Sequence, residues 1–172
     1  MTLEELTHVS TIAGVFLSFL TAVGTLFVLW RTLQLNAQSL ELNQRSIEFS
    51  LQAKQSDVLL HCNERFGRIW EMRANEHVKA DPFTFYERFW SLQLDQFTHW
   101  KDGFVDAGVF DSWMKGRYRQ WQDNHSLGAM AYRDGYEKAV ASWETPKFKS
   151  FMHEVHLHGP ETALSWWKQN GG

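Results

Sequence analysis

The chain has 172 residues, a length that fits one domain or one domain with an appendage. Its formal net charge of −3 argues against bulk nucleic acid as a partner, because domains that bind such polyanions are usually strongly basic. The single cysteine, Cys62, excludes an intrachain disulfide and suits a reducing compartment. Only 3 prolines and 11 glycines exclude collagen-like and low-complexity chains, whereas 13 Phe, 4 Tyr and 9 Trp form a large aromatic content.

The first predicted element is a membrane-spanning helix. Residues Val9 to Trp30 contain no charged side chain in 22 positions, and a helix of that length extends roughly 33 Å, enough to cross a hydrocarbon core. Trp30 and Arg31 stand where an interfacial aromatic residue and a snorkelling cation are expected. A cleaved signal peptide fits less well, because Glu4 and Glu5 precede the apolar segment in place of cations. Its length also disfavours a buried core helix.

Positive charge lies on one side of this segment. The first eight residues contain no Lys or Arg, whereas the following segment contains Arg31, Arg45, Lys54, Arg65, Arg68 and Arg73. Because the positive side of a membrane protein stays in the cytoplasm, we expect the N-terminus outside and the C-terminal domain in the cytoplasm. In a bacterial host this describes a single-pass protein of the inner membrane.

Small residues follow a four-residue spacing within the predicted span, at Ser10, Gly14, Ser18 and Ala22. Such a face lets two helices approach closely in lipid, which favours a homo-oligomer. The alternative is that these positions are small without any packing role, since small residues are common in spans.

A helical stalk is predicted from residue 32 to residue 75. Two seven-residue series run along it, offset by four: Leu33, Leu40 and Ile47, and Ala37, Gln44, Leu51 and Val58. This a/d pattern favours a self-associating amphipathic stalk, although it lasts only about three heptads. The alternative is one long helix that folds back on its own domain.

Near Val58 apolar residues occupy a wider part of the helix surface. We therefore expect this end of the helix to enter a core, with Cys62 as a buried structural thiol.

The remaining segment predicts a cytoplasmic all-α domain, giving an organisation of 1–31 anchor, 32–75 stalk and 76–172 helical domain. Apolar and aromatic residues recur there at three- and four-residue steps, and we find no sustained alternation that would predict strands. The expected helix boundaries are Asp81–Pro82, Lys101–Gly103, Asp106, Asp123–Asn124, Thr145–Pro146 and His158–Pro160.

Few residues in this domain suggest chemistry. His153, His156 and His158 could hold a transition metal or respond to pH, but their spacing is not HExxH, and surface or structural histidines are the favoured interpretation. The sequence contains no GxSxG, phosphate loop, GxGxxG or CxxC motif. We therefore expect a non-enzymatic protein without a metal or cofactor.

One basic and aromatic segment is a candidate ligand site. Its candidate residues are Trp113, Arg117, Arg119, Trp121 and Arg133. A guanidinium offers a planar fork to phosphate and an indole ring can stack a base, so this combination suits a small anionic ligand such as a nucleotide. The alternative is a core helix with a cationic outer face that pairs with Asp111 and Asp123.

The overall plan resembles small single-span bacterial inner-membrane proteins of unassigned function. The likeness rests on the span, the Gln-rich helix and the stretch FYERFWSLQLDQFTHWKDGFVDAGVFDSWM. Size, topology and the basic aromatic segment are also similar to membrane-anchored accessory effectors of type III CRISPR systems. That resemblance implies a cytoplasmic domain that binds cyclic tetra-adenylate as an oligomer and then perturbs the membrane, in antiviral defence. No binding residue is transferred from that family to this sequence.

Two functions from different classes therefore remain. The first is an oligomeric membrane-anchored sensor-effector that binds a small anionic ligand and signals to its spans. The second is a non-catalytic anchor or accessory subunit whose aromatic domain docks on a larger membrane protein complex, because tryptophans suit protein interfaces as well as ligand pockets.

Overall fold

The computed structural model describes residues 3–171, except for the side chains of residues 3–13, 76 and 80. Within those residues the fold is predominantly helical, with seven α-helices, one short 3-10 helix and one two-stranded hairpin. The chain divides into two compact units, one that ends at Ser50 and one that begins at Leu51. Each unit is described separately below.

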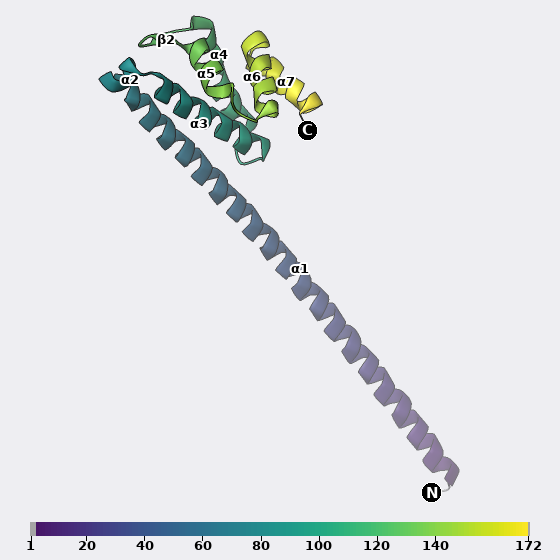
Figure 1. The fold of residues 1–172 in the computed structure, drawn as a ribbon. Coiled ribbons are helices and arrows are strands. Elements are labelled where there is room, and N and C mark those ends of the chain that lie inside the picture. The colour runs from purple at the N-terminus through teal and green to yellow at the C-terminus, as the bar shows by residue number, and fades with distance from the viewer. Residues whose placement is uncertain (1–2, 172) are drawn as a thin grey trace. The chain divides into compact units, whose positions relative to one another are not determined.

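The first unit is formed by most of helix α1, Leu3–Glu71, which is drawn as one uninterrupted helix in Figure 1. All of its described side chains up to Ser50 are exposed, including large apolar residues such as Leu17 and Leu26. Among the described residues, this is the helix that is long and apolar enough to cross a membrane. Ser10, the first residue of the predicted small-residue face, lies outside the described side chains.

The hydroxyl groups of the apolar segment bond within the helix. Ser18 Oγ donates to the carbonyl of Gly14 at 2.9 Å, and Thr21 Oγ1 donates to the carbonyl of Leu17 at 2.9 Å. Thr25 Oγ1 makes the same bond to the carbonyl of Thr21 at 2.8 Å. These polar side chains therefore do not depend on water for their hydrogen bonds.

Two apolar series are exposed farther along α1, before Ser50. One is the predicted series Leu33, Leu40 and Ile47, and the other, also with seven-residue spacing, is Leu35, Leu42 and Phe49. The exposed fractions of these six side chains lie between 52 % and 74 %. None of them is covered by the described part of its own chain.

The last part of α1 belongs to the second unit, where it contacts α3, Phe83–Lys101. Cys62 and Ile69 are buried in the core, and Arg65 binds Asp95 and Ser91 on α3. Burial is the main cause that raises the pKa of the Cys62 thiol. The prediction that this end of the helix enters the core and buries Cys62 is confirmed.

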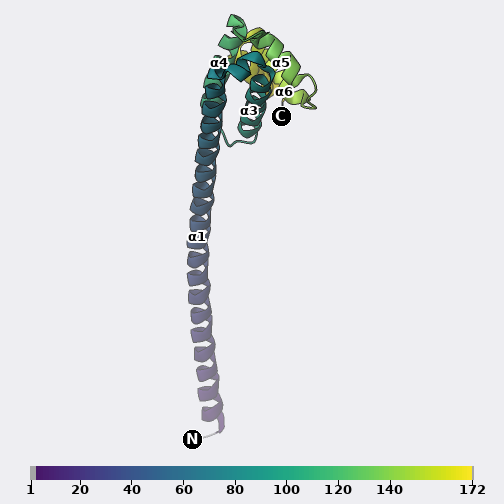
Figure 2. The same ribbon diagram turned by 60° about the vertical axis from the view of Figure 1, so that its left-hand side comes forward.

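Shorter helices complete the second unit. In chain order they are η1 Met72–Ala74, α2 Glu76–Ala80, α3, α4 Ala107–Asp123, α5 Tyr132–Val140, α6 Pro146–His158 and α7 Pro160–Asn170. Figures 1 and 2 show α3 packed beside α5, and α6 packed beside α7. Their inward faces form an aromatic core that includes Phe89, Trp90, Phe97, Phe110 and Phe151. Aromatic side chains thus supply much of the buried apolar surface.

Most predicted helix boundaries are confirmed. The Asp106 side chain accepts hydrogen bonds from the backbone N–H groups of Gly108 and Val109, so it caps α4. Asn124 ends α4 in the left-handed region with φ 47°, and Pro160 opens α7. The sequence predicts a Thr145 cap for α6, but the Thr145 hydroxyl makes no capping hydrogen bond, so only the following proline carries out its predicted role.

A short hairpin corrects the expectation that the domain has no strands. Strands β1, Ser126–Leu127, and β2, Met130–Ala131, are antiparallel and are joined by a two-residue turn. Gly128 has φ 59°, a conformation that suits the first central position of a tight hairpin turn. Two-residue strands are too short to produce a detectable alternation in sequence.

Candidate functional site

The basic and aromatic segment on α4 does not form one continuous surface. Arg117 points into the core with 6 % exposure, whereas Arg119 is exposed to solvent. Lys115 is also exposed and binds Asp111 at 2.8 Å and Glu161 at 3.1 Å. The helix therefore separates the two arginines that we expected to act together, and the predicted Asp111 pairing is present.

Arg117 is part of a buried network. Its Nε donates to Oε1 of Gln93 at 2.8 Å, and one terminal nitrogen donates to Oε1 of Gln120 at 3.0 Å. The guanidinium carbon also lies 5.1 Å from the ring centre of Phe66 and 4.7 Å from that of Phe89. Desolvation lowers the pKa of this guanidinium. Trp113, another predicted residue, is half-buried against the same hydrophobic core.

Trp121 and Arg133 are brought together as the candidate site requires. The guanidinium of Arg133 lies 5.3 Å from the centre of the Trp121 ring, which is a cation–π distance. Its Nε also donates to the carbonyl of Trp121 at 3.1 Å, and its backbone N–H donates to Oδ1 of Asn124 at 3.0 Å. These bonds connect the start of α5 to the end of α4.

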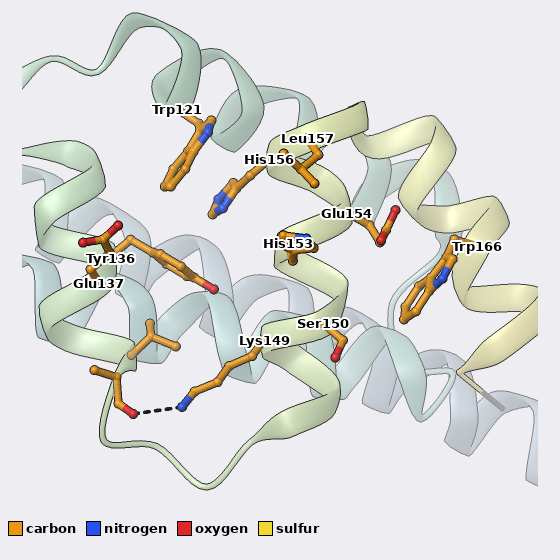
Figure 3. Close-up of a pocket in the computed structure, with 12 residues that line it drawn as sticks. Trp121, Tyr136, Glu137, Lys149, Ser150, His153, Glu154, His156, Leu157 and Trp166 are labelled. Atoms are coloured by element: carbon orange, nitrogen blue, oxygen red, sulfur yellow. Dashed lines mark hydrogen bonds between the residues drawn. The ribbon is translucent and has the colours of Figure 1, made fainter.

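Trp121 also lines an open cleft of about 780 Å³. The walls come from α5, α6, α7 and the end of α4, and Figure 3 shows the lining side chains from all four helices. The lining residues are Trp121, Tyr136, Glu137, Val140, Ala141, Lys149, Ser150, His153, Glu154, His156, Leu157 and Trp166. This volume is within the range of small-molecule sites in proteins.

His156 forms the aromatic centre of the cleft wall. Its imidazole stacks on Trp121 with ring centres 3.5 Å apart and an angle of 2°, and it meets Tyr136 edge-on at 4.8 Å. Burial lowers the pKa of His156 to about 3, with further lowering by His153 and Arg133, so the imidazole is neutral near pH 7. Its Nε2 has no hydrogen-bond partner within the described residues.

Polar groups of both signs surround these rings. Nζ of Lys149 donates to the carbonyl of Ala141 at 2.9 Å, a bond drawn in Figure 3. Glu137 and Glu154 also line the cleft. Burial raises the pKa of Tyr136, another lining residue, to about 12, so its hydroxyl stays protonated. In Figure 3, Trp121 and Trp166 lie on opposite sides of the group of labelled side chains. The cleft therefore combines aromatic surface with both hydrogen-bond donors and acceptors.

The histidine cluster does not converge on one point. His156 is buried, while His153 and His158 are exposed, and Nε2 of His158 lies 3.9 Å from Glu154. Across the described residues, no group of three or more His, Cys, Asp or Glu side chains is arranged to hold a metal ion.

Sequence reasoning missed Tyr136, Lys149, His156 and Trp166 as cleft residues. The apolar period placed Tyr136 and Trp166 on core-facing sides of their helices, and His156 was interpreted as a surface or structural histidine. Their common location depends on how α5, α6 and α7 pack, which helical periodicity does not specify.

Comparisons with known proteins give no relatives for this chain. No protein-family model, curated protein or solved structure matches it.

Proposed function

We propose that this protein is an oligomeric membrane-anchored sensor-effector whose helical domain binds a small anionic, ring-containing ligand. The membrane anchor is supported most directly by the long exposed apolar stretch of α1, because a helix in water would not leave so many large apolar residues exposed. The ligand acts by binding one arrangement of the assembled protein better than another, as any coupled conformational change requires.

Insertion of α1 into a bilayer is supported by the chemistry of its side chains. From Val15 to Trp30 the described large apolar residues are about half exposed or more, and no charge interrupts them. The hydroxyls of Ser18, Thr21 and Thr25 are bonded to carbonyls of their own helix, which lowers the cost of placing them in lipid. Arg31 follows directly, so the cytoplasmic side is proposed to begin there.

Self-association is supported by the exposed Leu33, Leu40 and Ile47 series. When the spans of several copies associate in the membrane, the helices that follow them lie close together. They can then bury these residues against each other in a coiled-coil seam. The proposed assembly is therefore a homo-oligomer through both the span and the stalk.

The cleft is the proposed ligand site. Trp121, Tyr136, His156 and Trp166 supply aromatic surface, Lys149 supplies positive charge within the cleft, and Arg133 lies over the ring of the lining residue Trp121. A nucleotide or cyclic oligonucleotide combines a planar base with phosphate, and the cleft volume suits ligands of that size. A role in antiviral defence is the corresponding biological proposal.

Binding by the full-length protein in detergent tests this proposal. Tryptophan fluorescence is measured during titration with mononucleotides, cyclic dinucleotides and cyclic oligoadenylates. We expect a saturable response, and Arg133→Ala should weaken it by about tenfold or more, since a charge-assisted contact is lost. Arg119→Ala is the matched control: neither arginine lines the cleft, but Arg133 lies over the ring of the lining residue Trp121, whereas Arg119 is exposed to solvent. A response that is absent from the folded protein, or equal in both variants, contradicts the proposal.

A docking subunit is the second candidate function. It is favoured by the aromatic side chains Trp121, Tyr136 and Trp166 in an open cleft, because aromatic residues are enriched at protein interfaces. Site-specific photo-crosslinking from Leu157, an exposed residue of the cleft, would then give a defined membrane-protein adduct in cells. Adduct formation without a ligand response would favour docking over sensing.

A further inference from the structure

A second, smaller cavity lies away from the cleft, where the C-terminal end of α1 meets α3, the end of α4, the hairpin and the start of α5. Its volume is about 60 Å³, with room for a group of only a few non-hydrogen atoms. The lining residues are Trp70, Arg73, Phe85, Tyr86, Phe89, Gln120, His125, Leu127 and Tyr132. The lining contains an arginine and a histidine but no carboxylate, unlike the lining of the cleft.

Tyr132, one of the lining residues, carries a hydrogen-bond donor that is not used within the fold. The residue is only 6 % exposed, and its buried hydroxyl has no partner among the described residues. Burial raises the pKa of Tyr132, so the hydroxyl stays protonated. A buried hydroxyl without a partner is unfavourable, and an acceptor placed in the cavity would satisfy it.

Arg117 supplies a buried positive charge directly behind the cavity wall. Its guanidinium donates to Gln120 and lies against the ring of Phe89, and both of those residues line the cavity. Its two hydrogen-bond partners, Gln93 and Gln120, are neutral amides. Among the described residues no carboxylate forms an ion pair with Arg117, so its charge is not compensated within the fold.

Further donors face the same space. Gln120 uses its amide oxygen to accept from Arg117, which leaves its amide N–H group for another acceptor. The guanidinium of Arg73 lies over the Trp70 ring at 4.2 Å, and both residues line the cavity. His125 also lines it, although its Nε2 lies 3.7 Å from Asp123.

We propose that this cavity is a binding site for one small oxyanion, such as a phosphate group, held by Tyr132 and Arg73 in front of the buried Arg117. The oxyanion accepts the Tyr132 O–H and the Gln120 N–H and balances the Arg117 charge. The inference does not depend on the cleft ligand, because none of these residues lines the cleft.

Equilibrium dialysis of full-length protein in detergent against radiolabelled inorganic phosphate tests the site. Sodium gluconate, an anion with a single negative charge, keeps the ionic strength constant. We expect saturable binding and a rise in Tm with phosphate concentration. Tyr132→Phe should weaken phosphate binding by about tenfold, the effect of losing one hydrogen bond to a charged group. Arg73→Gln should weaken it as well, and it leaves the buried core unchanged.

Two control variants separate phosphate binding in this cavity from binding elsewhere on the protein. Arg119→Gln removes an exposed charge outside the cavity, and Arg133→Ala changes the cleft, so both variants should bind phosphate as the native protein does. Circular dichroism establishes that each variant is folded. The proposal is overturned if folded native protein binds no phosphate, or if Tyr132→Phe and Arg73→Gln both bind it normally.

Two further ligands define the chemistry of the site. An equal rise in Tm with chloride would overturn the oxyanion assignment. AMP in place of phosphate tests whether the oxyanion can belong to a larger ligand. Competition by AMP supports a phosphoryl group, and its absence restricts the site to the free ion.

Discussion

Gly135 and Gly116 occupy interior positions of two helices, yet an added methyl group would meet different surroundings. At Gly135 a Cβ atom would lie 2.4 Å from Cγ of Tyr86, whereas at Gly116 no atom lies within 4 Å. Gly135 therefore permits the close approach of α5 to α3, and Gly116 contributes only backbone freedom.

We predict opposite effects of alanine at these two glycines. Gly135→Ala should lower the free energy of unfolding by about 1–3 kcal/mol, because α5 must move away from Tyr86. Gly116→Ala, the matched control, should raise it by about 0.5–1 kcal/mol through helix propensity. Urea denaturation followed by circular dichroism measures both values. If Gly135→Ala is as stable as the native protein, the helices do not approach as described.

His156 predicts a pH dependence of stability. Its pKa is about 3 in the folded chain and 6.5 ordinarily, so below pH 6.5 the unfolded chain binds a proton that the folded chain does not. Stability is thus lost as pH falls from 6.5 toward 3. Between pH 6.5 and 5 the native protein should lose about 1.5 kcal/mol more than His156→Phe, which keeps a ring against Trp121.

The His156 prediction is checked by denaturant unfolding of both proteins at several pH values above 5, where most carboxylates remain ionised. Equal slopes for native protein and His156→Phe would show that His156 is not kept neutral by its surroundings.

At the residue scale, the sequence indicated which residues could bind a ligand more reliably than it indicated what surrounds each of them in the fold. It singled out Trp121 and Arg133, which do meet, because cations and large rings stand close together in that segment. It also grouped Arg117 with Arg119, although α4 directs one into the core and the other to solvent. Arginine is rarely buried without a charged partner, so nothing in the local sequence indicated a buried Arg117.

At the scale of elements, helix ends were the most predictable features. Asp106, Asn124 and the Gly159–Pro160 pair act locally, through a side-chain cap, a left-handed residue and a missing N–H, so sequence alone locates them. The hairpin between α4 and α5 escaped prediction because its strands have only two residues each. The cleft escaped prediction because it requires four helices, α4 to α7, to pack in a particular way.

A prediction at the same scale concerns the exposed Leu33, Leu40 and Ile47 series of α1, the proposed coiled-coil seam. Leu40→Asp combined with Ile47→Asp places two charges in the proposed contact between copies, so the oligomer should dissociate in detergent. Mass measurement by light scattering detects the change. Glu41→Gln with Glu48→Gln is the control, because these neighbouring positions lie outside the seam and should leave the mass unaltered. A native protein that is already monomeric would exclude the proposed stalk contact.

For the whole molecule, the charge distribution predicts the topology. A reporter that is active only in the periplasm should be inactive when fused after Gly172, because the cationic residues follow the apolar segment. The same reporter fused before Met1 should be active. Moving two arginines to the N-terminal side should weaken this preference, and activity of the C-terminal fusion in the native sequence would contradict the assigned orientation.

The second exposed series on α1 limits the geometry of any assembly. Leu35, Leu42 and Phe49 each follow the Leu33, Leu40 and Ile47 series by two residues, which corresponds to about 200° around the helix. A pair of helices can cover only one of these opposite faces on each chain. If both faces are to be buried, every helix needs a neighbour on each side, and identical neighbours close such an arrangement into a ring with rotational symmetry. The symmetry axis of that ring would run parallel to the helices.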